Sequence, residues 1–187
     1  MSILESIQSK SFLGQEFLTW LLWRSEERSG VIGPGETEVH FGGVVELAAP
    51  FGEAEEVTLR GENPAASREL VTALGEGKLV AKAQMRWIVD GVEWTLSVRG
   101  ETLDFGGLKP PMKTGVPDPE WLERRLELLE GFARVFDAVH AEFLTLRLSE
   151  SAWKSETRQM RDWVAARAQT ADAPPPEIVE IGGEDEA

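Results

Sequence analysis

The segment from Lys78 to Arg99 constrains the fold more than any other part of this chain. Apolar and polar residues alternate along its first half, and a period of two is typical of a strand with one buried face. Asp90-Gly91 follows, a pair that favours the tight turn of a β-hairpin because both residues tolerate positive φ. The segment therefore predicts an antiparallel sheet in which Val89 lies opposite Val92.

This register separates the side chains of the hairpin into an apolar face and a polar, partly cationic face. The apolar face should carry Leu79, Ala81, Ala83, Met85 and Trp87, with Trp87 opposite Trp94, Met85 opposite Leu96 and Ala83 opposite Val98. The polar face should carry Lys78, Val80, Lys82, Gln84 and Arg86, with Arg86 opposite Thr95, Gln84 opposite Ser97 and Lys82 opposite Arg99. Its cations suit a polyanion, whereas the simpler interpretation is a sheet face that contacts water.

The rest of the chain completes an α+β domain over residues 12–169. We expect an antiparallel sheet with a short helix and a long C-terminal helical hairpin or kinked helix packed on it. Residues 1–11 should form a loose leader. Further strands are predicted at Thr37–Phe41, Val44–Ala48, Glu55–Arg60 and Glu101–Phe105, and helices at Phe12–Arg28, at Asn63–Leu74 with Asn63 as N-cap, from Asp118-Pro119 onward and from Ser149 onward.

The helix that begins at Asp118-Pro119 carries a long apolar stripe at three- and four-residue steps. Burying its eight side chains contributes roughly 12–24 kcal/mol gross, at about 1.5–3 kcal/mol each. The stripe must therefore pack on the sheet or on a partner chain. It consists of Leu122, Leu126, Leu129, Phe132, Phe136, Val139, Phe143 and Leu146.

Composition excludes several classes of function. The chain of 187 residues has no Cys, which excludes disulfides, thiol catalysis and thiolate metal sites. Its two histidines, His40 and His140, have no metal-ligand spacing and should be packed side chains. No serine lies in a nucleophile-elbow pattern. We therefore expect no enzyme, no catalytic residue, no metal and no cofactor.

The N-terminus has no signal-peptide pattern, and the longest nearly continuous apolar run, Phe17–Trp23, is too short to span a bilayer. A cytoplasmic protein without a membrane partner is expected.

The net charge of −14 argues against indiscriminate binding to nucleic acids. Six of the acidic residues lie in the last 16 positions, without Lys or Arg, so the preceding part of the chain carries −8. Residues 170–187 therefore predict a disordered acidic tail. A surface for DNA must be local.

Several segments of the chain, taken in order, resemble one protein family. The residues concerned are Phe12-Leu13-Gly14-Gln15-Glu16-Phe17-Leu18-Thr19-Trp20-Leu21, Trp23-Arg24-Ser25-Glu26, Gly77-Lys78-Leu79-Val80-Ala81-Lys82-Ala83-Gln84-Met85-Arg86-Trp87 and Glu101-Thr102-Leu103-Asp104-Phe105. They resemble the C-terminal half of the bacterial recombination-associated protein RdgC family, over residues 12–110. Where that family carries basic and amide residues before its short helix, this chain has Gly61-Glu62-Asn63.

The resemblance implies non-specific binding of duplex DNA by a ring-like homodimer, association with the nucleoid, and moderation of RecA-driven strand exchange. Lys78, Lys82, Arg86 and Arg99 are then the candidate phosphate contacts. Because so few contacts bind weakly, a homo-oligomer is expected. The alternative is a protein-interaction or assembly module that lost DNA binding and acts with a separate protein partner, which the negative charge and the acidic tail favour.

Overall fold

The computed structural model describes residues 3–33, 35, 37–49, 56–109 and 119–171. These ranges contain an antiparallel sheet and four α-helices, the α+β fold that the sequence predicts. The elements are α1 (Ile3–Glu27), β1 (Glu38–Ala48), β2 (Val57–Gly61), the 3₁₀ turn η1 (Pro64–Ala66), α2 (Arg68–Gly75), β3 (Leu79–Val89), β4 (Val92–Arg99), β5 (Phe105–Lys109), α3 (Pro119–Leu148) and α4 (Glu150–Ala171).

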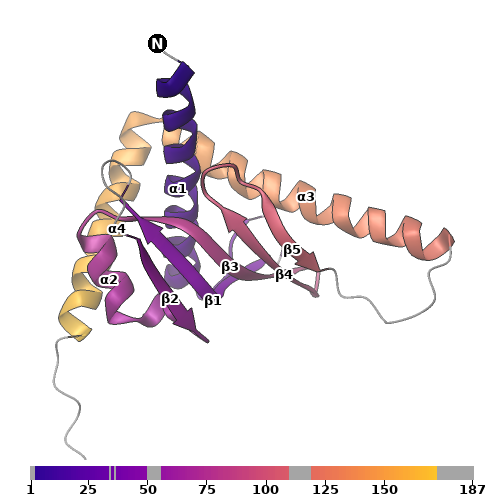
Figure 1. The fold of residues 1–187 in the computed structure, drawn as a ribbon, viewed down its shortest axis with the longest axis horizontal. Helices are drawn as coiled ribbons and strands as arrows, with labels where there is room; N and C mark the ends of the chain where they lie inside the picture. Colours follow the sequence, from indigo (N-terminus) through magenta and orange to yellow (C-terminus); the bar gives the residue numbers. More distant parts are fainter. Residues whose placement is uncertain (1–2, 34, 36, 50–55, 110–118, 172–187) are drawn as a thin grey trace, which may run out of the picture.

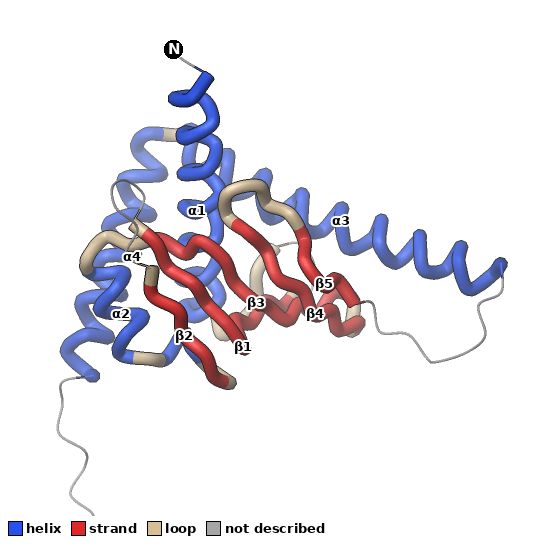
Figure 2. Tube along the Cα trace, viewed as in Figure 1, coloured by secondary structure: helices blue, strands red, loops and turns tan. Residues whose placement is uncertain are grey.

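The five strands form one sheet in the order β2-β1-β3-β4-β5, and every neighbouring pair is antiparallel. Helices α1 and α3 lie behind the sheet in Figures 1 and 2, and α2 packs against α4. None of the described helices crosses the front of the sheet in this view (Figure 2). The sheet therefore has one face in the core and one open face.

The β3–β4 hairpin has the predicted register. Trp87 lies opposite Trp94, and Lys82 lies opposite Arg99. Asp90 and Gly91 have φ of 51° and 73°, the left-handed conformation that such a turn requires. The prediction of this hairpin is confirmed residue by residue from position 82 to position 99.

The start of strand β3 differs from the prediction, because Val80 is buried in the core and does not lie on the polar face. The pairing with β1 skips one residue: Glu46 lies opposite Lys82 and Leu47 opposite Val80. Such a bulge reverses the alternation, since each strand residue shifted by one position changes face. The polar alternation of the outer face therefore begins at Lys82.

Several predicted elements differ from the structure. The strands expected at Thr37–Phe41 and Val44–Ala48 form the single strand β1, and the strand expected at Glu101–Phe105 begins only at its last residue, as β5.

The helices differ at three places. Helix α1 begins at Ile3, so most of the expected loose leader is helical, consistent with the absence of Gly and Pro from residues 3–11. The cap of α2 is Ser67, whose Oγ accepts from the Leu70 amide at 3.2 Å, while Asn63 makes no side-chain cap. Helix α4 continues to Ala171, and residues 172–187 lie outside the described ranges.

Aromatic side chains join α3 to the sheet. Phe132 lies 5.0 Å from Trp94 and 5.6 Å from Trp87 between ring centroids. Phe136, Val139 and Phe143 are also buried, which confirms the core side of the predicted stripe. Its N-terminal part is different, because Leu122 and Leu126 are about half exposed.

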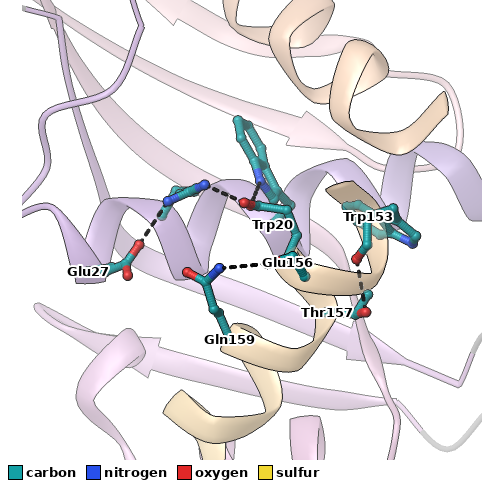
Figure 3. A network of polar contacts seen from close by, with 8 residues as sticks. Trp20, Glu27, Trp153, Glu156, Thr157 and Gln159 are labelled. Carbon is teal, nitrogen blue, oxygen red and sulfur yellow. Dashed lines mark hydrogen bonds and ion pairs between the residues drawn. The ribbon is translucent and has the colours of Figure 1, made fainter. Parts of the chain in front are cut away.

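A buried carboxylate fixes α4 against α1 (Figure 3). Glu156 is 6% exposed, and it accepts one hydrogen bond from Trp20 Nε1 at 3.0 Å and another from Arg24 at 2.6 Å. Because all three groups are removed from most of the water, this contact fixes the two helices in one register.

Candidate nucleic-acid interface

The open face of the sheet, called here the outer sheet face, gathers polar side chains from four strands. Strand pairing places them on the same side, opposite the buried residues of each strand. Its charged and polar members are Glu38, His40 and Glu46 of β1, Thr58 and Arg60 of β2, Lys82, Gln84 and Arg86 of β3, and Glu93, Thr95, Ser97 and Arg99 of β4.

Three of the four predicted phosphate contacts lie together on this face. Lys82 is directly opposite Arg99, and Arg86 lies two residues further along the same side of β3. Lys78 lies elsewhere: its side chain is 11% exposed, and it lines a groove formed by α2 and α4. The structure therefore separates Lys78 from the other three candidates.

Two of these cations have carboxylate partners. Lys82 Nζ lies 2.6 Å from Glu46 Oε1, and both side chains are about one-third exposed. Arg86 is 3.9 Å from Glu93, at the outer limit of an ion pair, and both side chains are more than half exposed. Exposed pairs of this kind contribute about 0–1 kcal/mol, so an incoming phosphate competes with them at little cost.

Arg60 is a fourth cation of the outer sheet face, and sequence reasoning missed it. It lies opposite Val44 on the edge strand β2, and neither Arg60 nor Arg99 forms an ion pair with any residue that the structure describes. The position of Arg60 depends on the order of the strands in the sheet. Nothing in the sequence of residues 55–60 shows that this strand pairs with β1 and does not lie at the opposite edge of the sheet.

Arg60 and Lys82 line a shallow hollow of about 430 Å³ in the middle of the outer sheet face. Gln84, which lines the hollow, lies against Gly43 in the bulge of β1, where φ is 73° and a Cβ atom would overlap the side-chain amide of Gln84. The hydroxyl of Ser97 donates to the carbonyl of Gly106 at 3.0 Å on the opposite rim. Gly43 and Gly106 therefore leave room for the amide of Gln84 and the hydroxyl of Ser97 between the cations of this face.

His40 also lies on this face and is only partly packed: its ring lies against Gly30, where a Cβ atom would overlap it. It is about one-third exposed and lies 3.0 Å from Glu38. His140, in contrast, is packed as predicted, 4.9 Å from the ring of Phe17.

The charge of the outer sheet face differs from that of the whole chain. On strands β1 to β4 it carries four cations, Arg60, Lys82, Arg86 and Arg99, against three carboxylates, Glu38, Glu46 and Glu93. The balance is slightly positive, while the chain carries −14. Arginine, lysine, amide and hydroxyl side chains supply many of the contacts that proteins make to phosphate and sugar.

No family model, no curated protein and no solved structure matches the chain. The resemblance to the RdgC family therefore stays a prediction. Within the ranges that the structure describes, no helix combines the length and apolar character needed to cross a membrane.

Proposed function

We propose that this protein binds the phosphate backbone of duplex DNA non-specifically through its outer sheet face, in a recombination or nucleoid role like that of the RdgC family. The observation that supports this is the clustering of Arg60, Lys82, Arg86 and Arg99 on the open face of an otherwise acidic protein. The face reads no bases, because no helix or ribbon projects from the described part of it into a groove.

The proposed binding is weak for one copy. Three or four phosphate contacts lose roughly 40- to 150-fold in affinity between 50 and 200 mM salt, at a slope of about −0.9 per contact. The acidic body repels phosphate as well, since its charge acts over a Debye length of about 10 Å at 0.1 M salt. Useful affinity then depends on several copies along one duplex.

Charge reversal on the outer sheet face tests the proposal. We expect Lys82→Glu with Arg86→Glu to abolish binding to a fluorescent duplex of 20–30 base pairs, about the length of a small protein site, measured by anisotropy at 50 mM salt. The matched control is Arg158→Glu, an exposed reversal on α4 away from the sheet. It changes the net charge by half as much and should leave most of the binding.

A third variant distinguishes a local contact from a general charge effect. Glu46→Gln releases Lys82 from its partner without adding a cation. We expect it to strengthen duplex binding by up to about fivefold, corresponding to the ~1 kcal/mol limit of an exposed pair. Absence of binding by the wild-type protein, or equal binding by the double reversal, contradicts the proposal.

The second candidate function is an assembly module, and the exposed end of α3 favours it. Leu122 and Leu126 are 53% and 52% exposed and lie on one side of the helix, where α3 extends past the sheet (Figure 1). Residues of both signs surround them, with Arg124 beside Glu123 and Glu127. The occupant that suits this mixed surface is the same segment of a second copy, paired about a two-fold axis.

Light scattering on a size-exclusion column tests that assembly. The wild-type protein should elute as a dimer, and Leu122→Glu with Leu126→Glu should convert it to a monomer of unchanged circular dichroism. A monomeric wild type, or a dimer that persists in the variant, contradicts self-association through α3.

A further inference from the structure

A second site lies away from the outer sheet face, in the groove between α2 and α4. The groove has a volume of about 840 Å³ and is lined mainly by apolar side chains from three helices. They are Trp23 of α1, Val71 and Leu74 of α2, and Met160, Trp163 and Val164 of α4. An open apolar groove of this size suits a short segment with several aliphatic side chains.

The border of the groove is cationic on balance. Lys78 and Arg161 line it together with Glu76, and Glu76 lies 2.7 Å from Lys78 Nζ. Arg161 is exposed and forms no ion pair with another described residue. An occupant that places a carboxylate beside Arg161 is therefore complementary in charge.

The sequence that follows α4 has this chemistry. Its one aliphatic cluster is Ile178-Val179-Glu180-Ile181, preceded by Glu177. Helix α4 ends at Ala171, one turn beyond Ala168, which lines the groove. The five residues 172–176 span up to about 17 Å when extended, and the lining stretch of α4, from residue 157 to residue 168, is about 16 Å long. The cluster therefore reaches the whole groove.

We propose that residues 177–181 of this same chain occupy the groove between α2 and α4, with aliphatic side chains toward Trp23 and Met160 and a glutamate beside Arg161. The acidic tail is then anchored at its middle, while its last residues extend from the domain. This inference is independent of DNA binding, because it concerns another surface and another ligand.

The absence of Cys makes a disulfide assay specific, because introduced thiols are the only ones in the chain. Thr72→Cys places a thiol on an exposed, groove-lining position of α2, and Val179→Cys places the second within the cluster. The full-length double variant is equilibrated in a glutathione redox buffer, and the fraction of intramolecular disulfide gives the effective concentration of one thiol at the other.

The matched control pairs Thr72→Cys with Glu186→Cys, further along the tail. In an undocked tail, the chain from the end of α4 to residue 186 is longer than the chain to residue 179. Because effective concentration falls with about the −3/2 power of this length, the control pair should have an effective concentration only about threefold lower. If the tail docks, the effective concentration measured for the Val179→Cys pair should exceed that of the control pair by more than about tenfold, a difference of 1.4 kcal/mol or more. Adding Ile181→Asp to the Val179→Cys pair should reduce this excess to about threefold or less.

Two outcomes overturn the proposal. If the effective concentration of the Val179→Cys pair is only about three times that of the control pair or less, and Ile181→Asp does not change it, the cluster does not occupy the groove. A disulfide found mainly between two chains, and increasing with protein concentration, shows that the tail of a second copy is the occupant instead. Circular dichroism of the Ile181→Asp variant, which should match that of the wild type, separates either result from unfolding.

Discussion

Among single residues, Glu156 has the most demanding environment. Its carboxylate and the Arg24 side chain are about 8% and 12% exposed, and the carboxylate accepts hydrogen bonds from both Arg24 and Trp20 Nε1 (Figure 3). A buried pair gives little net stability compared with apolar residues, but removing Glu156 leaves Arg24 with only the more exposed carboxylate of Glu27, 3.0 Å away. The role of Glu156 is therefore to fix where α4 lies on α1.

Glu156→Ala should lower the free energy of unfolding by up to about 3–5 kcal/mol, because Trp20 Nε1 then loses its acceptor and Arg24 keeps only the more exposed Glu27 as partner. Glu156→Gln keeps the shape and one acceptor, and should lose about 1–3 kcal/mol. Urea unfolding followed by tryptophan fluorescence measures both. If the alanine variant unfolds at the wild-type midpoint, Glu156 does not hold α4.

The protonation of the partly buried His140 should make the stability of the protein fall at acid pH. Burial against Phe17 and Phe143 lowers its pKa from the ordinary value of 6.5, and the nearby Asp137 carboxylate partly opposes that shift. The unfolded chain thus binds the proton more readily than the folded protein. The stability that neutral His140 contributes is complete above pH 6.5, and it is lost as the pH falls below that value toward the folded pKa.

We expect the difference in unfolding free energy between the wild type and His140→Gln to be larger at pH 8 than at pH 5. Both proteins contain the same carboxylates, so their acid titration cancels in this difference. Denaturant unfolding at the two pH values gives the result, and a ring titration by NMR should place the pKa of His140 below 6.5. A difference that grows toward acid pH contradicts the packing described.

At the scale of elements, the position of α1 depends on a close backbone contact. Gly14 of α1 faces the turn after β4, where a Cβ atom at residue 14 would overlap the carbonyl oxygen of Gly100. On the next part of the helix, the hydroxyl of Thr19 accepts from the Val80 amide at 2.9 Å. These contacts place α1 across the sheet at β3 and β4.

Gly14→Ala should destabilise the protein by about 1–3 kcal/mol, as expected when a packed contact is overfilled. Gly75→Ala is the matched control, because residue 75 is helical and a Cβ atom there meets only Val164, at 3.9 Å. The control should be neutral or stabilising by up to about 1 kcal/mol. Thermal unfolding of the two variants compares them, and equal melting temperatures would exclude the close approach.

Sequence patterns predict elements whose signals are local. The β3–β4 hairpin has its turn and both strands within 22 residues, and its register is confirmed. The predicted face of Val80 was wrong, because it depends on a bulge in the pairing with β1. The predicted N-cap of α2 was also wrong, because Asn63 and Ser67 are both suitable caps close together in the sequence. Arg60 was missed since its place depends on which strands are neighbours.

At the scale of the whole molecule, the charges are segregated. On strands β1 to β4 the cations of the outer sheet face outnumber its carboxylates by one, whereas the chain as a whole is strongly negative. A duplex that approaches the protein from any other direction meets net negative charge and is repelled. The protein should therefore bind DNA in one orientation, with the outer sheet face toward the duplex. The same segregation makes the binding depend strongly on salt.

The salt dependence of duplex binding by the wild-type protein is the most direct test of this proposal. Anisotropy titrations between 50 and 200 mM salt should show an affinity loss of roughly 40- to 150-fold, the value for three or four phosphate contacts. Single reversal of Arg60 or Arg99 should reduce the slope by about one contact. Affinity that hardly changes over this range, or a slope that neither reversal alters, would contradict a phosphate-binding sheet face.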